Sequence, residues 1–271
     1  MIDLKEATFI IPIRIESSDR LRNVITTTAF LLENFDTNIF IKEVDSESIF
    51  QREALPILKN ILDIDIDVNH IFEKDLSTSF HRQKVLNEMI IETNTKVVVN
   101  YDCDVLLPLD SYSEAYHSIL DNTYDVVYPY GQGIYQKQVQ SSDEVVSKFL
   151  ETTDYSILNS NSNEFTSDFG WVQFFNRQVY IDGGMENENF IAYAPEDKER
   201  FYRFTTLGYN VGRINDYVYH LEHIRGQNSW FNNPHMQSNN DLWEEIQKMN
   251  KEKLKDYYSK QDYLKKYYGS R

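Results

Sequence analysis

Two carboxylates one residue apart stand where an apolar segment ends. Residues 97–108 read VVVNYDCDVLLP, so Asp102 and Asp104 follow a run with the composition of a buried strand. Charged groups beside a buried strand are costly unless they have partners. Past the end of a strand the backbone turns, and both side chains can then approach one cation. Divalent ions such as Mg²⁺ and Mn²⁺ bind carboxylate and phosphate oxygens, so the motif indicates a metal site for a diphosphate. A solvated turn is the alternative interpretation.

Two histidines three residues apart offer the further ligands that such an ion needs. His220 and His223 lie in YHLEHIRG, near the end of the last strand that the sequence predicts. Manganese accepts a mixed shell of carboxylate and imidazole, so these residues are chemically compatible with the Asp pair. A pair of surface or hydrogen-bonded histidines is the alternative.

The elements that must position these residues alternate in the first half of the chain. Short apolar, β-branched runs predict strands at 7–13, 38–44, 68–74 and 96–102. The segments between them predict helices at 18–32, 50–62 and 80–93, with Pro56 as a break and Ser79 as a helix cap. This alternation predicts an α/β fold with a mainly parallel central sheet flanked by helices. Ligands of such sheets bind beyond the carboxyl ends of the strands, where the Asp pair stands.

The second half of the chain continues the domain to about residue 240. Strands are predicted at 124–130, 171–175, 210–214 and 217–221. A helix is predicted at 195–209, with proline at its start and Gly208 near its end. No linker rich in Gly, Pro or Ser divides residues 1–240, so a single domain, large enough for an enzyme, is expected there.

The composition limits the classes of partner and compartment. The chain has 271 residues, a formal net charge of -16 and 41% hydrophobic residues, which are ample for a folded core. Such a charge repels nucleic acid, and a bound nucleotide would need a divalent cation to screen its phosphates. The single cysteine, Cys103, excludes an internal disulfide and a cysteine-based zinc site. The sequence shows neither a signal peptide nor a membrane span, so a cytoplasmic location is expected.

Residues 241–271 form a tail of different composition. Residues 246–271 contain eight basic and three acidic residues, a net charge of +5. At helical spacing one stripe carries the apolar residues Trp243, Ile246, Leu254, Tyr257, Leu264 and Tyr268. An amphipathic helix that packs this stripe on the domain is one interpretation. The other is an interfacial helix that makes peripheral contact with anionic lipid.

Six ordered blocks of the sequence resemble those of a known family. They are IIPIR (10–14), FHRQKVLN (80–87), YDCDVLLP (101–108), DFGWV (168–172), PEDKERFYR (195–203) and HLEHIRG (220–226). In this order they are similar to blocks of β-1,4-galactosyltransferase-type enzymes and of the related polymerases of chondroitin-like chains. Those enzymes are inverting, metal-dependent glycosyltransferases of the GT-A fold. The similarity covers roughly residues 7 to 235.

The resemblance implies a role for each matching residue. Donor-binding roles fall on Pro12, Arg14, Phe80, Arg82, Asp102, Asp168 and Trp171. Asp104, His220 and His223 would hold Mn²⁺, with Mg²⁺ as the alternative. Asp197 would be the general base, and Glu196 would hold a substrate hydroxyl. Tyr193 would stand in the acceptor platform. Aromatic faces stack on sugars, so Tyr128, Tyr130 and Trp171 are further candidates for an acceptor groove, and a place in the core is the alternative for each.

The expected activity is transfer of galactose or N-acetylgalactosamine from a UDP-sugar to a glycan or lipid-linked glycan. Inversion requires a base that removes the proton of the attacking hydroxyl, and the start of a helix favours an ionised carboxylate there. Acids are also common in the first turn of a helix, which is the alternative for Glu196 and Asp197. Three positions depart from the family pattern: Glu16 replaces an arginine, Tyr193 a tryptophan, and Asp168 an aromatic or small residue.

Two other functions compete with this one. A sugar-1-phosphate nucleotidyltransferase would need a glycine-rich phosphate loop after the first strand, and IIPIRIESSDR has none. A non-catalytic subunit that binds a glycan or nucleotide sugar would keep the fold. Such a subunit has no reason to retain the metal ligands together with Asp197.

Overall fold

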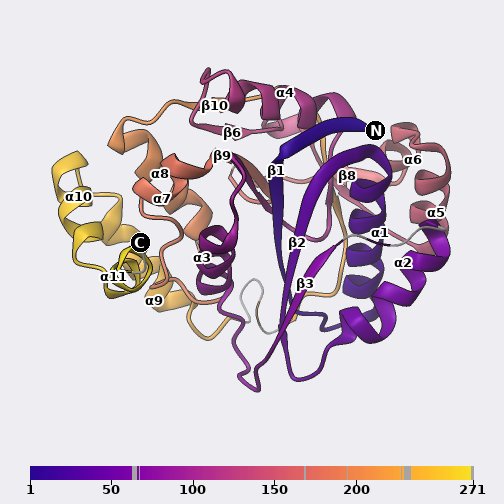
Figure 1. Ribbon diagram of the computed structural model, residues 1–271, viewed down its shortest axis with the longest axis horizontal. Coiled ribbons are helices and arrows are strands. Elements are labelled where there is room, and N and C mark those ends of the chain that lie inside the picture. Colours follow the sequence, from indigo (N-terminus) through magenta and orange to yellow (C-terminus); the bar gives the residue numbers. More distant parts are fainter. Residues whose placement is uncertain are drawn as a thin grey trace.

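The computed structural model describes residues 1–62, 66, 68–167, 169–193, 195–226, 228 and 233–269. Within these residues a seven-stranded sheet runs through the molecule in the order β10-β6-β9-β4-β1-β2-β3 (Figure 1). Its strands are β1 (Ile2–Ile13), β2 (Phe35–Asp45), β3 (Asn69–Lys74), β4 (Val97–Tyr101), β6 (Val126–Tyr128), β9 (Val172–Asn176) and β10 (Val211–Arg213). The central strands β1 and β4 are apolar and largely buried, as the sequence predicts.

The pairing of the strands is mainly parallel. β1 pairs in parallel with β2 and β4, β2 with β3, and β6 with β10. β9 is the exception, since it runs antiparallel to both β4 and β6. The prediction of an α/β fold with a mainly parallel sheet is therefore confirmed.

Helices cover both sides of this sheet in Figure 1. On one side lie α1 (Ser18–Asn34), α2 (Leu55–Leu62), α5 (Asp143–Thr152) and α6 (Tyr155–Ser160). On the other lie α3 (Arg82–Glu92), α7 (Arg177–Asp182) and α8 (Glu196–Leu207), while α4 (Leu109–Leu120) crosses the top of the view. The hydroxyl of Ser17 caps α1 by accepting from the Arg20 amide.

Two predicted helix features differ in detail. The cap of α3 is His81, whose Nδ1 accepts from the Lys84 amide, and not Ser79, whose hydroxyl contacts His235 instead. Pro56 does not end its helix. The chain forms a π-helical turn over Phe50–Ala54 and continues directly into α2, because a wider turn accommodates the missing amide hydrogen of a proline in the next turn.

A second, four-stranded sheet has the order β5-β11-β7-β8. Its strands are β5 (Val105–Leu106), β7 (Gln136–Val139), β8 (Ser162–Glu164) and β11 (Val218–Leu221). The sequence predicts only β11 as a separate strand, because β7 and β8 are short and polar. The pairing of β11 with β5 places His220 opposite Val105, the residue after Asp104. Histidine and carboxylate therefore meet although they are far apart in the chain.

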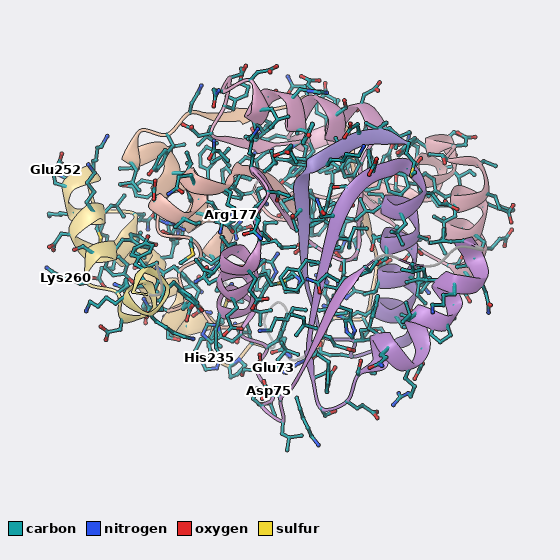
Figure 2. All side chains as sticks on the ribbon, in the orientation of Figure 1. Glu73, Asp75, Arg177, His235, Glu252 and Lys260 are labelled. Carbon is teal, nitrogen blue, oxygen red and sulfur yellow. The ribbon has the colours of Figure 1, made fainter. Side chains whose placement is uncertain are left out.

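The tail is three short helices, α9 (Met236–Ile246), α10 (Lys251–Ser259) and α11 (Asp262–Tyr268), and not one continuous helix. From the predicted stripe, Ile246, Leu254 and Leu264 are buried in the core. Charged residues lie on the outer side, where Figure 2 shows Glu252 and Lys260 pointing away from the body. The stripe thus packs on the domain, which is the first of the two interpretations.

Among the helices of the described residues, none combines the length and apolar character needed to cross a membrane. The division into a catalytic domain (1–240) and a tail (241–271) stays a prediction, and α9 extends across its boundary.

Candidate functional site

One cavity at the carboxyl ends of β1 and β4 gathers almost all of the predicted site residues. Its lining includes Pro12, Arg14, Phe80, Arg82, Asp102, Asp104, Trp171, Tyr193, Glu196, Asp197, His220 and His223. Asp168 lies outside the described residues. The sequence therefore predicts which residues meet, while their individual roles stay predictions.

Asp104, His220 and His223 form a buried cluster that could hold a metal ion. One ligand atom from each lies within 4.8 Å of the others. Nε2 of His223 is 3.2 Å from one carboxylate oxygen of Asp104, and Nε2 of His220 is 3.7 Å from the other. Three donors converging at these distances suit a small cation between them.

The protonation of the cluster fits a metal. Burial lowers the pKa of His220 to about 4, so its imidazole is neutral. Burial alone would raise the pKa of Asp104, but His220 and His223 hold it well below its usual range. Nδ1 of His223 lies 2.9 Å from the Ile224 carbonyl oxygen, which suits a tautomer with Nε2 free for a metal. The donor set of one carboxylate and two imidazoles fits Mn²⁺.

Asp102 does not join this cluster. Its carboxylate lies 2.5 Å from a guanidinium nitrogen of Arg82, which also donates to the Asn100 side chain at 2.9 Å. The candidate metal group that the described residues form contains Asp104 without Asp102. The described geometry thus gives no support for both carboxylates converging on one cation, and the donor-binding role implied for Asp102 stays a prediction. β4 ends at Tyr101 and the chain turns at Cys103 and Asp104, so the two side chains do not share one strand face and contact different partners.

Arg14 is occupied by the protein itself. Its guanidinium donates to the carbonyl oxygens of Val44 and Ser77 and to the Asp75 carboxylate, at 2.8 to 3.1 Å. Figure 2 shows Asp75 at the lower edge of the molecule, close to where β3 ends. The Arg14 guanidinium also lies 5.4 Å from the centre of the Phe80 ring. Arg14 therefore ties the ends of β2 and β3 together and packs against Phe80 in the lining of the cavity.

Glu196 and Asp197 occupy the first turn of α8. Burial and the neighbouring Asp197 charge raise the pKa of Glu196 to about 8, so this side chain is mostly protonated at neutral pH. Burial also raises the pKa of Asp197, against the opposing effect of Arg200. Arg200 opposes protonation of Asp197 while Glu196 stays mostly protonated, an arrangement that suits one hydrogen-bond donor and one base.

The raised pKa of Glu196 predicts a stability change with pH. The folded state binds this proton more tightly than the unfolded state, so the group's contribution is present below pH 4.5 and is lost as pH rises towards 8. Because Glu196 is partly open to the cavity, we expect a loss of about 2 kcal/mol. Denaturant unfolding of wild type and Glu196→Gln at pH 5 and pH 9 measures it. At pH 9 the free energy of unfolding of Glu196→Gln should exceed that of wild type by this amount. If the two proteins gave the same unfolding curves at both pH values, the raised pKa of Glu196 would be contradicted.

Trp171 is strained and lies between the two sheets. Its backbone φ is +71°, a left-handed conformation that is rare for a bulky residue. Its ring stacks on His220 at 6.0 Å, and such strain is typical of functional sites. Tyr128 and Tyr130 are fully buried, so the core alternative holds for these two residues. Tyr193 is 45% exposed at the cavity and keeps its predicted place.

The sequence interpretation missed three basic residues of the cavity. Among the described residues its lining includes Arg20, Arg200 and Arg225, besides the predicted Arg14 and Arg82. A guanidinium nitrogen of Arg20 is 3.9 Å from Asp104. In a chain with a net charge of -16, this group supplies positive charge where a diphosphate would need it. Arg200 and Arg225 lie within the blocks PEDKERFYR and HLEHIRG, which are the sequence signal that could have found them, whereas Arg20 lies in none of the blocks.

Comparison with known proteins identifies the fold. A solved structure with high coverage is the mannosyltransferase PcManGT from Pyrobaculum calidifontis, in complex with GDP-Man and Mn²⁺. The match covers 97% of this chain and 72% of that one, with a TM-score of 0.54 and 14% sequence identity. The chain has a GT-A-type glycosyltransferase fold. No model of a known protein family matches it, and no curated protein does. The finer resemblance to β-1,4-galactosyltransferases stays a prediction.

Proposed function

We propose that this chain is a metal-dependent glycosyltransferase that moves a sugar from a nucleoside-diphosphate sugar to a hydroxyl group. The observation that carries the proposal is the Asp104–His220–His223 cluster in the same cavity as Glu196 and Asp197. A cation site for the diphosphate and a carboxylate for the acceptor are the two components that such a transfer needs. The GT-A-type fold supports the same activity.

The donor that we favour is UDP-galactose or UDP-N-acetylgalactosamine, on the sequence resemblance. GDP-mannose is the second candidate, because the similar mannosyltransferase was solved with GDP-Man. The acceptor would be a glycan or a lipid-linked glycan. Calorimetric titration of UDP-, GDP- and other nucleotide sugars with Mn²⁺ ranks the donors, and transfer to labelled oligosaccharides tests the activity. Binding without transfer to any acceptor would favour a non-catalytic subunit.

The residues of the cavity suggest an inverting displacement. The acceptor oxygen attacks the anomeric carbon of the sugar while its proton passes to the Asp197 carboxylate. The bond between this carbon and the diphosphate oxygen breaks, and the electron pair stays on the diphosphate. A bound Mn²⁺ would supply charge stabilisation for the leaving diphosphate, held by Asp104, His220 and His223. Protonated Glu196 would donate a hydrogen bond to a substrate hydroxyl.

The ligand set predicts a metal preference. Two imidazoles and one carboxylate favour Mn²⁺ over Mg²⁺, which prefers oxygen ligands. We expect donor binding to be at least about tenfold tighter with Mn²⁺, a difference of about 1.4 kcal/mol. Titrating the protein with each metal, alone and with UDP, measures the preference. If the donor bound equally tightly with Mg²⁺, the histidines would not be ligands of the ion.

A further inference from the structure

Two buried arginines on α8 hold different partners. Arg200 is 2% exposed and donates from Nε and one terminal nitrogen to both oxygens of Glu186, at 2.7 and 2.8 Å. Arg203 is 0% exposed and pairs with Glu199, 2.8 Å away on the same helix. The ring of Tyr258, from the tail, lies 4.6 Å from the Arg203 guanidinium. Only the first of the two arginines lines the cavity.

Glu186 is itself held firmly. Its backbone amide donates to the Asn87 side chain at 2.8 Å, and its carbonyl oxygen accepts from the same side chain at 3.0 Å. The Tyr180 hydroxyl donates to its carboxylate. A bidentate pair between a fixed carboxylate and Arg200 leaves the guanidinium one orientation.

The remaining nitrogen of Arg200 begins a chain of hydrogen bonds beneath the cavity. It donates at 3.0 Å to Oε1 of Gln173, which also accepts from Asn100 at 3.1 Å. Gln173 and Asn100 are register partners on β9 and β4. Arg82 bonds to Asn100 and pairs with Asp102. Nε2 of Gln173 donates to two backbone carbonyl oxygens, so its amide orientation is fully specified.

This network places a fixed cation beside the Glu196–Asp197 pair. Arg200 follows Glu196 by four residues and Asp197 by three, so all three lie on neighbouring positions of one helix. Other described groups that interact electrostatically with the pair include Lys198 of α8, Arg82 of α3, Tyr193 before α8, and Tyr128 and Tyr130 of the β6 region. Lys198 is exposed, so Arg200 and Arg82 are the cations that act from within the protein.

We propose that Arg200, locked by Glu186 and Gln173, is a positioning residue that holds a fixed positive charge one helical turn from Asp197 and thereby favours its ionised carboxylate. Its catalytic consequence rests on the proposed function, but its effect on the carboxyl groups does not. Burial raises the pKa of both Glu196 and Asp197, and Arg200 opposes that rise in both. Without Arg200, the pKa of Asp197 would rise further, so a smaller fraction of the carboxyl groups would be ionised and able to accept the proton of the acceptor hydroxyl.

The test compares two neutralised ion pairs on the same helix. The double variant Arg200→Met with Glu186→Gln removes the proposed pair, and Arg203→Met with Glu199→Gln is the matched control. ¹³C NMR titration of the Asp197 and Glu196 carboxyl groups, assigned with Asp197→Asn and Glu196→Gln, reads their protonation without any substrate. We expect the Asp197 midpoint to rise by about one pH unit in the first variant and to stay at the wild-type value in the control. Unchanged midpoints in the first, or an equal rise in both, would overturn the proposal.

Gln173→Glu tests the same proposal if the double variant does not fold. The new carboxylate would contact Arg200 and cancel part of its charge, so the Asp197 midpoint should again rise. An unchanged midpoint here would also overturn the proposal. The pH profile of transfer is the second readout, and its acidic limb should move with the NMR midpoint. A shifted midpoint in a protein that transfers no sugar would refute the proposed function alone, whereas an active enzyme with unshifted midpoints would refute this inference alone.

Discussion

Asp197→Asn is expected to abolish glycan transfer while leaving donor binding nearly intact. The asparagine keeps the size of the side chain but cannot accept the proton of the attacking hydroxyl, and a positioned base typically contributes about 10²–10⁴-fold. Single-turnover transfer and calorimetric donor titration on the same preparation measure the two quantities separately.

The matched control is Asp143→Asn, because Asp143 also stands in the first turn of a helix but has a side chain that is 92% exposed. This control should transfer sugar at the wild-type rate. Should Asp197→Asn retain transfer within a factor of about 10, a barrier change of about 1.4 kcal/mol, the base must be another residue. Glu196 is then the next candidate, although its pKa of about 8 leaves it mostly protonated at neutral pH.

Asp104→Ala is expected to remove most of the metal-dependent donor affinity. Its carboxylate is the only acid of the cluster that the described residues form, and both histidines lie against it. Loss of residues that merely orient a ligand costs about 10–100-fold in affinity, so loss of a ligand should cost at least about 100-fold. Titration of UDP with and without Mn²⁺ gives this factor directly.

Asp102→Asn separates the two carboxylates of the motif. Asp102 pairs with Arg82 and not with the histidines, so this variant should weaken donor binding while keeping its dependence on Mn²⁺. If manganese-dependent donor binding survived in Asp104→Ala but disappeared in Asp102→Asn, the metal ligand would be Asp102 and not Asp104.

The patterns with strong local signals were the ones that the sequence predicted well. The apolar strands β1 and β4, the helices between them and α8 appear close to their expected positions, because each is a long run with consistent periodicity or clear end signals. The strands β7 and β8 were missed because short polar segments form a strand only when a partner strand lies beside them. The tail was predicted as one helix, since periodicity does not reveal where Asn250 caps a new one.

In the candidate site, too, some features followed from the sequence and others depended on the tertiary structure. Residue chemistry indicated Asp104, His220 and His223 as candidate metal ligands, because few side chains bind a metal, whereas Asp197 was selected through the resemblance to a known family. That Asp102 turns towards Arg82 while Asp104 turns towards the histidines depends on which elements surround the strand end. Arg20 has no motif around it, and only the fold brings it to the cavity.

By itself the sequence determined the alternation of strands and helices, the acidic character of the chain and the residue types available for chemistry. These properties are local or additive, so they can be read along the chain. Only the tertiary structure decided that β11 pairs with β5, which brings His220 to Asp104, and that Glu186, Arg200 and Gln173 form one network beneath the cavity. Such contacts join residues distant in sequence, and they form because the core packs in one arrangement that leaves each buried charge beside its partner.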